Sequence, residues 1–98
     1  MTTKENIISL LKFHKPELEK LGVQNIGLFG SYVRNEQVAK SDIDLLIDFK
    51  PEKENFDNYM AVYDMFEDIF KNEKIGIVTK NGLSKYIGAK ILKDVVYV

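Results

Sequence analysis

Between residues 42 and 49, apolar residues alternate with a second set of positions that includes three aspartates. Alternation with a period of two predicts a β-strand whose two faces differ in character. One face is wholly apolar and is expected to face a hydrophobic core. Its residues are Ile43, Leu45, Ile47 and Phe49. The other face begins with Asp42 and Asp44, which lie about 6.5 Å apart along an extended strand.

The N-terminal segment predicts a helix that is interrupted at a proline. Residues 2–5, Thr-Thr-Lys-Glu, match the capping box that begins many helices. Apolar residues then follow at helical spacing, at Ile7, Ile8 and Leu11. Because proline lacks a backbone N–H, Pro16 predicts a break near His14 and Lys15, with a second short helical turn behind it. Gly22 is expected to end this turn.

The rest of the chain predicts further strands and helices in alternation. In chain order these are a strand at residues 24–29, a short helix from Ser31, the strand that ends at residue 49, an amphipathic helix at 56–70, a strand at 74–79 and a helix at 83–91. The apolar tail at residues 95–98 either docks as an edge strand or meets a partner. A small sheet with helices packed on one face predicts an α+β fold.

Composition limits the class of protein. Ninety-eight residues with 45% hydrophobic content suffice for one domain, residues 1–98, and leave little room for a second. Without cysteine, neither a disulfide framework nor a thiolate metal site can form. A net charge of −1 argues against binding along an extended nucleic acid, which needs a basic groove. With no apolar run of membrane-spanning length and no signal peptide, a soluble, cytoplasmic protein is expected.

Two short stretches carry candidate chemistry. Gly30 and Ser31 follow an apolar strand, and such a turn presents backbone N–H groups and a small hydroxyl to an anion. Asp42 and Asp44 place two like charges side by side, which is unfavourable unless a cation lies between them. Mg²⁺ binds carboxylate oxygens together with substrate phosphates. Each stretch alone is common as a plain turn or a solvated strand edge, but the two together favour a phosphate site beside a metal site.

Arg34 is a third candidate, because it is the only arginine in a chain whose other basic side chains are lysines. Its planar guanidinium can bind a phosphate through two parallel hydrogen bonds, which a lysine cannot do. The alternative is an arginine that faces solvent, and the sequence leaves both open.

These residues resemble the signature of the minimal nucleotidyltransferases, small members of the polymerase-beta-like nucleotidyltransferase superfamily. That family carries Gly-Ser, then ten residues, then Asp-x-Asp. Here Gly30 and Ser31 are followed, after residues 32–41, by Asp42 and Asp44. The resemblance covers most of the chain, since it also includes Arg34, Ser41 and residues 75–83.

The resemblance implies a fold, a site and a partner. The fold would be α+β with a small mixed sheet. Gly30, Ser31 and Arg34 would bind the nucleotide, and Asp42 and Asp44 would be the catalytic ligands of Mg²⁺. The protein would be the antitoxin of a two-gene module, transferring AMP from ATP onto a tyrosine of a HEPN-domain RNase toxin.

The chain departs from the family at a third carboxylate on a neighbouring strand, where this sequence has Gly76. Asp48 is too distant to replace it, because it lies about 13 Å from Asp44 along the strand, whereas paired catalytic metals lie about 3.5–4 Å apart. Glu73, just before the strand, would need a long reach back. We therefore expect nucleotide binding with weakened transfer.

Three functions stay open at this point. The first is the active adenylyltransferase antitoxin, and the absence of an acceptor-binding domain fits its protein acceptor. The second is a catalytically degenerate antitoxin of the same fold that binds its partner or a nucleotide, and Gly76 favours it. The third is a subunit that supplies a nucleotide site to a separate chain binding a small acceptor such as an aminoglycoside.

Overall fold

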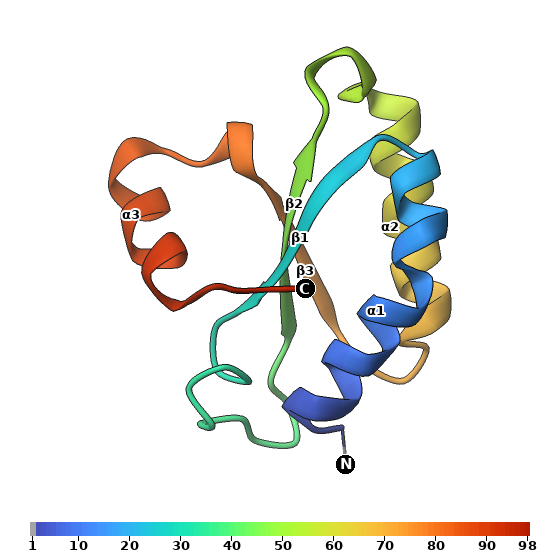
Figure 1. The fold of residues 1–98 in the computed structure, drawn as a ribbon. Coiled ribbons are helices and arrows are strands. Elements are labelled where there is room, and N and C mark those ends of the chain that lie inside the picture. Colours follow the sequence, from blue (N-terminus) through green and yellow to red (C-terminus); the bar gives the residue numbers. More distant parts are fainter. Residues whose placement is uncertain (1) are drawn as a thin grey trace.

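A computed structural model describes residues 2–98 of the chain. Its helices are α1 (Lys4–Lys20), α2 (Phe56–Ile69) and α3 (Lys85–Asp94), with short 3₁₀ helices η1 (Pro51–Lys53) and η2 (Lys80–Gly82). The strands β1 (Val23–Phe29), β2 (Ile43–Phe49), β3 (Ile75–Thr79) and β4 (Val96–Tyr97) form a sheet in the order β3-β2-β1-β4 (Figure 1). β3 is parallel to β2, whereas β1 is antiparallel to β2 and to β4. The predicted α+β class with a small mixed sheet is confirmed.

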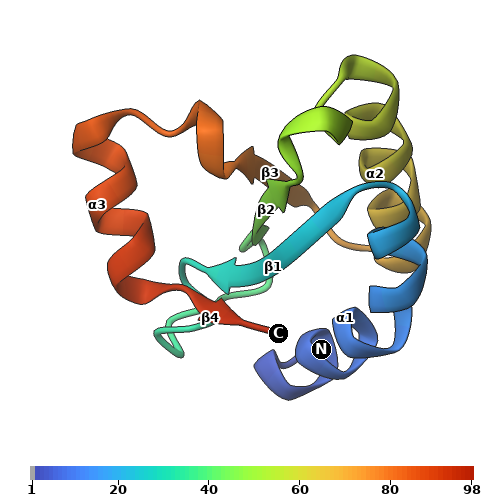
Figure 2. The same ribbon diagram turned by 45° about the horizontal axis from the view of Figure 1, so that its top comes forward.

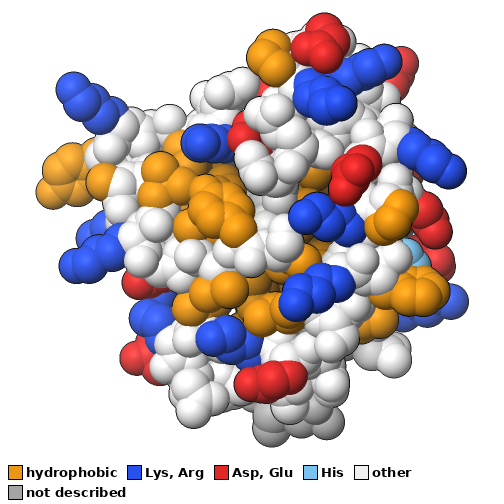
Figure 3. Space-filling model, viewed as in Figure 1, with side chains coloured by type: hydrophobic (Ala, Val, Ile, Leu, Met, Phe, Trp, Pro, Cys, Tyr) orange, Lys and Arg blue, Asp and Glu red, His pale blue; other side chains and the backbone are white. Residues whose placement is uncertain are grey.

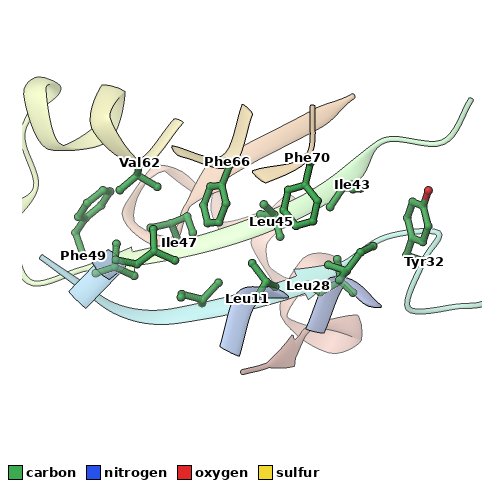
Figure 4. Close-up of a cluster of buried hydrophobic side chains, with 14 residues drawn as sticks. Leu11, Leu28, Tyr32, Ile43, Leu45, Ile47, Phe49, Val62, Phe66 and Phe70 are labelled. Carbon is green, nitrogen blue, oxygen red and sulfur yellow. The ribbon is translucent and has the colours of Figure 1, made fainter. Parts of the chain in front are cut away.

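The hydrophobic core lies between the sheet and a layer formed by α1 and α2 (Figure 1). The predicted apolar face of β2 is at most 1% exposed; it comprises Ile43, Leu45, Ile47 and Phe49. Val62 and Phe66 of α2 and Leu11 of α1 point at this face (Figure 4). Each buried side chain of this size stabilises the fold by about 1.5–3 kcal/mol. Because this face is fixed against the helices, Asp44 is fixed on the opposite face of the sheet.

The third helix, α3, does not join the layer formed by α1 and α2. In Figures 1 and 2 it lies apart from them, beyond the sheet. Gly88 is buried, whereas Tyr86 and Ile87 are 85% and 58% exposed. The prediction that the helices pack on one face is therefore right for α1 and α2 and wrong for α3. Within residues 2–98 the core takes no side chain from α3, so nothing apolar draws this helix to the other two.

Pro16 does not interrupt the first helix. α1 runs from Lys4–Lys20 with Pro16 inside it, so the predicted break near His14 and Lys15 is wrong. A proline in a helix interior costs roughly 3 kcal/mol. Ile7, Leu11 and Leu18 are fully buried on both sides of it and hold both halves of the helix in the core, which offsets this cost.

The two ends of α1 are fixed by different residues. The side chain of Thr3 caps the start and accepts a hydrogen bond from the backbone N–H of Asn6 at 3.2 Å. The Thr2 hydroxyl instead donates to Oε1 of Glu73 at 2.6 Å, so the capping box predicted at residues 2–5 is wrong. Gly22 follows the end of the helix, as predicted, with a φ of 93° that favours glycine. None of the helices in the described part of the chain is both long and apolar enough to cross a membrane.

Residues 31–35 form a hydrogen-bonded turn rather than the short helix predicted from Ser31. The backbone N–H groups of Val33 and Arg34 donate to the carbonyl oxygen of Gly30 at 3.1 and 3.3 Å. Asn35 then adopts a left-handed conformation, with a φ of 58°, which a right-handed helix cannot continue. The chain therefore forms a single turn here and does not continue as a helix.

The C-terminal tail docks as an edge strand, which was one of the two alternatives for it. β4 pairs with β1, placing Val96 opposite Leu28 and Tyr97 opposite Gly27 (Figure 2). Gly27 permits this close approach, because a Cβ at that position would collide with the side chain of Val95. The pairing brings the end of α3 close to the end of β1, where the candidate site lies.

Candidate active site

The candidate site is centred on Asp44, in the middle of a row that crosses three strands. Asp44 of β2 pairs with Phe29 of β1 on one side and with Gly76 of β3 on the other. This row lies where β1 ends and the turn at residues 30–35 begins. The sheet register therefore brings together the two stretches that the sequence separates by ten residues.

Gly30 lies directly against the carboxylate of Asp44. Its φ is 83°, a conformation that disfavours every residue with a side chain. A Cβ at this position would also collide with Oδ2 of Asp44. Glycine is therefore needed for two reasons, and the result is a stretch of bare backbone beside an acidic side chain.

The turn after Gly30 leaves backbone donors available. The carbonyl oxygen of Ser31 accepts a hydrogen bond from Glu36 at 2.9 Å, which holds the turn closed. Within residues 2–98 the N–H groups of Ser31 and Tyr32 donate to no protein acceptor. Successive unpaired N–H groups and a nearby hydroxyl form the kind of concavity that binds anions.

The two aspartates differ in their surroundings. Asp42 precedes β2 and is exposed, whereas Asp44 is half-buried. Burial raises the pKa of Asp44 above its usual range, the neighbouring Asp42 carboxylate raises it further, and Arg34 acts in the opposite direction. Ionised Asp44 is thus an unfavourable charge in the free protein, which a bound cation would relieve.

Gly76 faces Asp44 from the third strand, as the family register predicts. A Cβ added to Gly76 would lie 3.1 Å from Oδ1 of Asp44. Across residues 2–98, no group of three His, Cys, Asp or Glu side chains could hold a metal. The two aspartates and the turn therefore fit a Mg²⁺ that also takes phosphate oxygens, and they do not fit a metal held by the protein alone.

The other acids that could have replaced the missing carboxylate have different roles. Asp48 is buried and accepts hydrogen bonds from the side-chain amides of Gln24 and Asn25, both at 3.1 Å. Glu73 accepts the hydrogen bond from Thr2. It lies near the Tyr32 hydroxyl, whose pKa is raised by burial and, to a smaller degree, by the Glu73 charge.

Arg34 is exposed, which was one of the two alternatives for it, and its contact with a phosphate stays a prediction. Its Nε donates to Oε1 of Glu36 at 2.7 Å, and its Nη1 donates to Oδ2 of Asp94 at 3.1 Å. These hydrogen bonds, Glu36 first, raise the pKa of the guanidinium. With its side chain 46% exposed, Arg34 lies beside the site but is paired with two carboxylates.

Sequence reasoning missed two lysines that face this region from α3. Lys90 and Lys93 line a pocket together with Gly30, Arg34 and Asp94. Figure 3 shows basic side chains spread along α3 and around the apolar hollow between this helix and the sheet. No local signal marks these lysines, because only the docking of β4 on β1 brings the end of α3 to the turn.

Comparisons with known proteins show the family and the fold of the chain. The family model for polymerase beta nucleotidyltransferases matches residues 5–98. Protein adenylyltransferase MntA of Thermococcus cleftensis is 39% identical over 99 aligned residues, which cover all of this chain and 98% of the relative. A solved structure assigned provisionally as a minimal nucleotidyltransferase superposes with a TM-score of 0.83 at 20% identity, covering 97% of this chain and 95% of the other. A toxin–antitoxin structure with AMP-PNP superposes with a TM-score of 0.65 at 21% identity, covering 93% of this chain and 68% of the other.

Proposed function

The chain belongs to the polymerase beta nucleotidyltransferase family, and we propose that it is a minimal nucleotidyltransferase that transfers AMP from ATP to a tyrosine of a HEPN-domain toxin. It would thereby act as the antitoxin of a toxin–antitoxin pair. The observation that carries this proposal is the contact of the Gly30 backbone with the Asp44 carboxylate. A phosphate-binding turn and a metal-binding acid are thereby held at one point.

The comparisons support both halves of the proposal. The relative from Thermococcus cleftensis, which matches along its whole length, is a protein adenylyltransferase. The toxin–antitoxin structure with AMP-PNP combines the same fold with an ATP analogue and a protein partner. A protein acceptor also fits the exposed apolar side chains of α3. Among these are Tyr86 and Ile87, which are accessible for contact with a partner.

The residues of the turn and of β2 would divide the work between them. The N–H groups of Ser31 and Tyr32 would hold the nucleotide phosphates, and Asp42 and Asp44 would bind Mg²⁺ that those phosphates also bind. When bound, Mg²⁺ neutralises phosphate charge and favours ionisation of the attacking hydroxyl. The tyrosine oxygen would bond to the α-phosphorus as the bond to the leaving pyrophosphate breaks. The protein's own contribution is to fix the phosphates and exclude other orientations.

A second candidate function has its own supporting observation, which is Gly76. Because glycine supplies no ligand opposite Asp44, one side of the metal site lacks a carboxylate. A degenerate antitoxin of the same fold would bind its partner or a nucleotide, but it would transfer nothing.

One experiment separates these functions. The protein would be co-expressed with the product of the neighbouring reading frame, and the complex incubated with Mg²⁺ and ATP labelled on the α-phosphate. A label on a toxin tyrosine supports the adenylyltransferase. Complex formation and ATP binding without a label support the degenerate antitoxin. Failure to bind ATP would overturn the adenylyltransferase, and failure to form the complex as well would overturn both.

A double substitution tests the site itself. Asp42→Asn with Asp44→Asn keeps the shape of both side chains and removes their charge, so Mg²⁺-dependent ATP binding should be lost with little change in fold. Glu17→Gln with Glu19→Gln, two exposed acids of α1 outside the site, is the control of equal charge. Calorimetry should find the control unchanged, and a double variant that binds Mg-ATP like the parent would refute the assignment.

A further inference from the structure

The pocket beside Gly30 holds more positive charge than the rest of the candidate site. It has a volume of about 570 Å³ and lies between the turn after β1 and the C-terminal half of α3. Lys90 and Lys93 of α3 line the pocket, as does Arg34 of the turn. Asp94 is the one carboxylate among the lining residues. A pocket with this balance favours an anion of more than one charge.

The two lysines are available for such a ligand. Ion pairs in the described chain involve Arg34 and Lys71, and none involves Lys90 or Lys93. The position of Lys93 is set by the sheet, because Val96, three residues further on, pairs with Leu28 of β1. A lysine whose backbone is held near the end of a strand loses less freedom on binding than one on a mobile segment.

Gly30 belongs both to this pocket and to the surroundings of Asp44. A chain of phosphates laid along the Gly30 backbone would therefore have acids and their metal at one end and basic side chains at the other. A monophosphate is too short to reach both. This arrangement distinguishes a triphosphate from its monophosphate product.

We propose that Lys90, Lys93 and Arg34 bind the outer phosphates of the nucleoside triphosphate, and that Arg34 leaves Asp94 to do so. This inference rests on the proposed function and adds the residues that select a triphosphate. Exposed ion pairs such as that of Arg34 with Asp94 contribute little to stability, so exchanging the partner is easy. A phosphate accepts two parallel hydrogen bonds from a guanidinium and carries more charge than one carboxylate.

The test compares two double variants of equal charge. Lys90→Gln with Lys93→Gln removes two charges from the pocket. Lys80→Gln with Lys85→Gln removes two charges from η2 and the start of α3, outside it. Affinities for ATP and for AMP would be measured by calorimetry in excess Mg²⁺. We expect the pocket variant to bind ATP at least tenfold more weakly, with AMP affinity within twofold of the parent, and the control variant to bind both as the parent does.

The exchange of Arg34 has its own readout. Asp94→Asn keeps the side-chain shape and removes the ion pair at Nη1 of Arg34, while Nε stays paired with Glu36. ATP should therefore bind about twofold to fivefold more tightly, the range that an exposed ion pair allows. Equal ATP affinity in the two double variants, or equal losses for ATP and AMP, would overturn the role of the lysines. Unchanged or weaker ATP binding by the Asp94 variant would overturn the exchange. A parent protein that binds no ATP would refute the proposed function, and this inference with it.

Discussion

Replacing Gly76 by aspartate tests both the geometry of the site and its missing acid. Asp44 pairs with Gly76 across β2 and β3, and a Cβ at residue 76 would lie 3.1 Å from Oδ1 of Asp44. An aspartate there must bring its carboxylate close to that of Asp44. Gly76→Asn is the matched control, because its side chain has the same shape and causes the same crowding without charge.

The size of the destabilisation expected for Gly76→Asp follows from the separation of the two carboxylates. Two like charges about 4 Å apart repel each other by about 4 kcal/mol at an effective dielectric constant of 20. Because Asp44 and Gly76 are both partly exposed, solvent and salt reduce this to roughly 2 kcal/mol. In a domain of this size each kcal/mol shifts Tm by about 4–8 °C, so the aspartate variant should melt about 8–16 °C below the asparagine variant in EDTA.

The repulsion depends on pH and on metal. Carboxyls that repel each other have raised pKa values in the folded protein, so the penalty is absent below the pKa of the unfolded chain and grows as pH rises. The difference in Tm between Gly76→Asp and Gly76→Asn should therefore be large at pH 7.5 and should vanish at about pH 3.5. Mg²⁺ should raise the Tm of Gly76→Asp more than that of Gly76→Asn, since a cation between three carboxylates replaces repulsion with attraction.

The assays are thermal melting with EDTA or Mg²⁺ and transfer of labelled AMP to the partner. If a third acid is what the site lacks, Gly76→Asp should speed transfer at least tenfold, or about 1.4 kcal/mol of barrier. Equal melting of the two variants in EDTA would show that residue 76 does not face Asp44. Unequal melting with no gain in transfer would keep the geometry and refute the need for the third acid.

Three further predictions concern the same region. Asp44→Asn should raise Tm at pH 7 in EDTA, because burial and Asp42 disfavour the ionised acid. Melting followed by circular dichroism should show this gain in Tm fading below about pH 4, where Asp44 of the parent is protonated and as neutral as the asparagine. Gly30→Ala should lower the free energy of unfolding by about 2 kcal/mol or more, because of the positive φ and the collision with Asp44. Denaturant unfolding should show partial rescue by Asp44→Ala, since that substitution removes the collision but not the positive φ. Gly27→Ala should loosen the C-terminal tail and increase its proteolysis, with rescue by Val95→Ala; no change would mean that the tail is not held by this contact.

Much of the central sheet was predictable, because burial on one face leaves a period of two in the sequence. The apolar positions of β2 alternate strictly at residues 43, 45, 47 and 49, and all four are buried; Leu46 and Asp48, on the other face, are buried as well. The same alternation places Asp44 on the other face. The grouping of the candidate residues was predictable to the same extent, since the aspartates and the Gly-Ser turn are local signals that two neighbouring strands bring together; their role as a site stays a prediction.

The errors come from places where tertiary contacts outweigh local preference. Pro16 should break a helix by its own chemistry, but Leu11 and Leu18 on either side are buried in one core and keep α1 continuous. The turn at Ser31 has the first hydrogen bonds of a helix, but the left-handed Asn35 stops it. Nothing in the local sequence places α3 relative to the sheet, so the lysines at its end could not be assigned to the site.

The two glycines beside Asp44 have opposite consequences for the proposed function. Gly30 brings the backbone of the turn against the carboxylate and so favours phosphate binding, whereas Gly76 leaves the other side of the carboxylate without a ligand. Under the proposed function, the missing acid would weaken the site for the attacking hydroxyl more than the site for the triphosphate, which would keep its turn and two aspartates. A site of this composition should bind the nucleotide well and turn over slowly. Slow turnover would suffice for a toxin, because each toxin molecule in a stable complex with the enzyme needs to be modified only once.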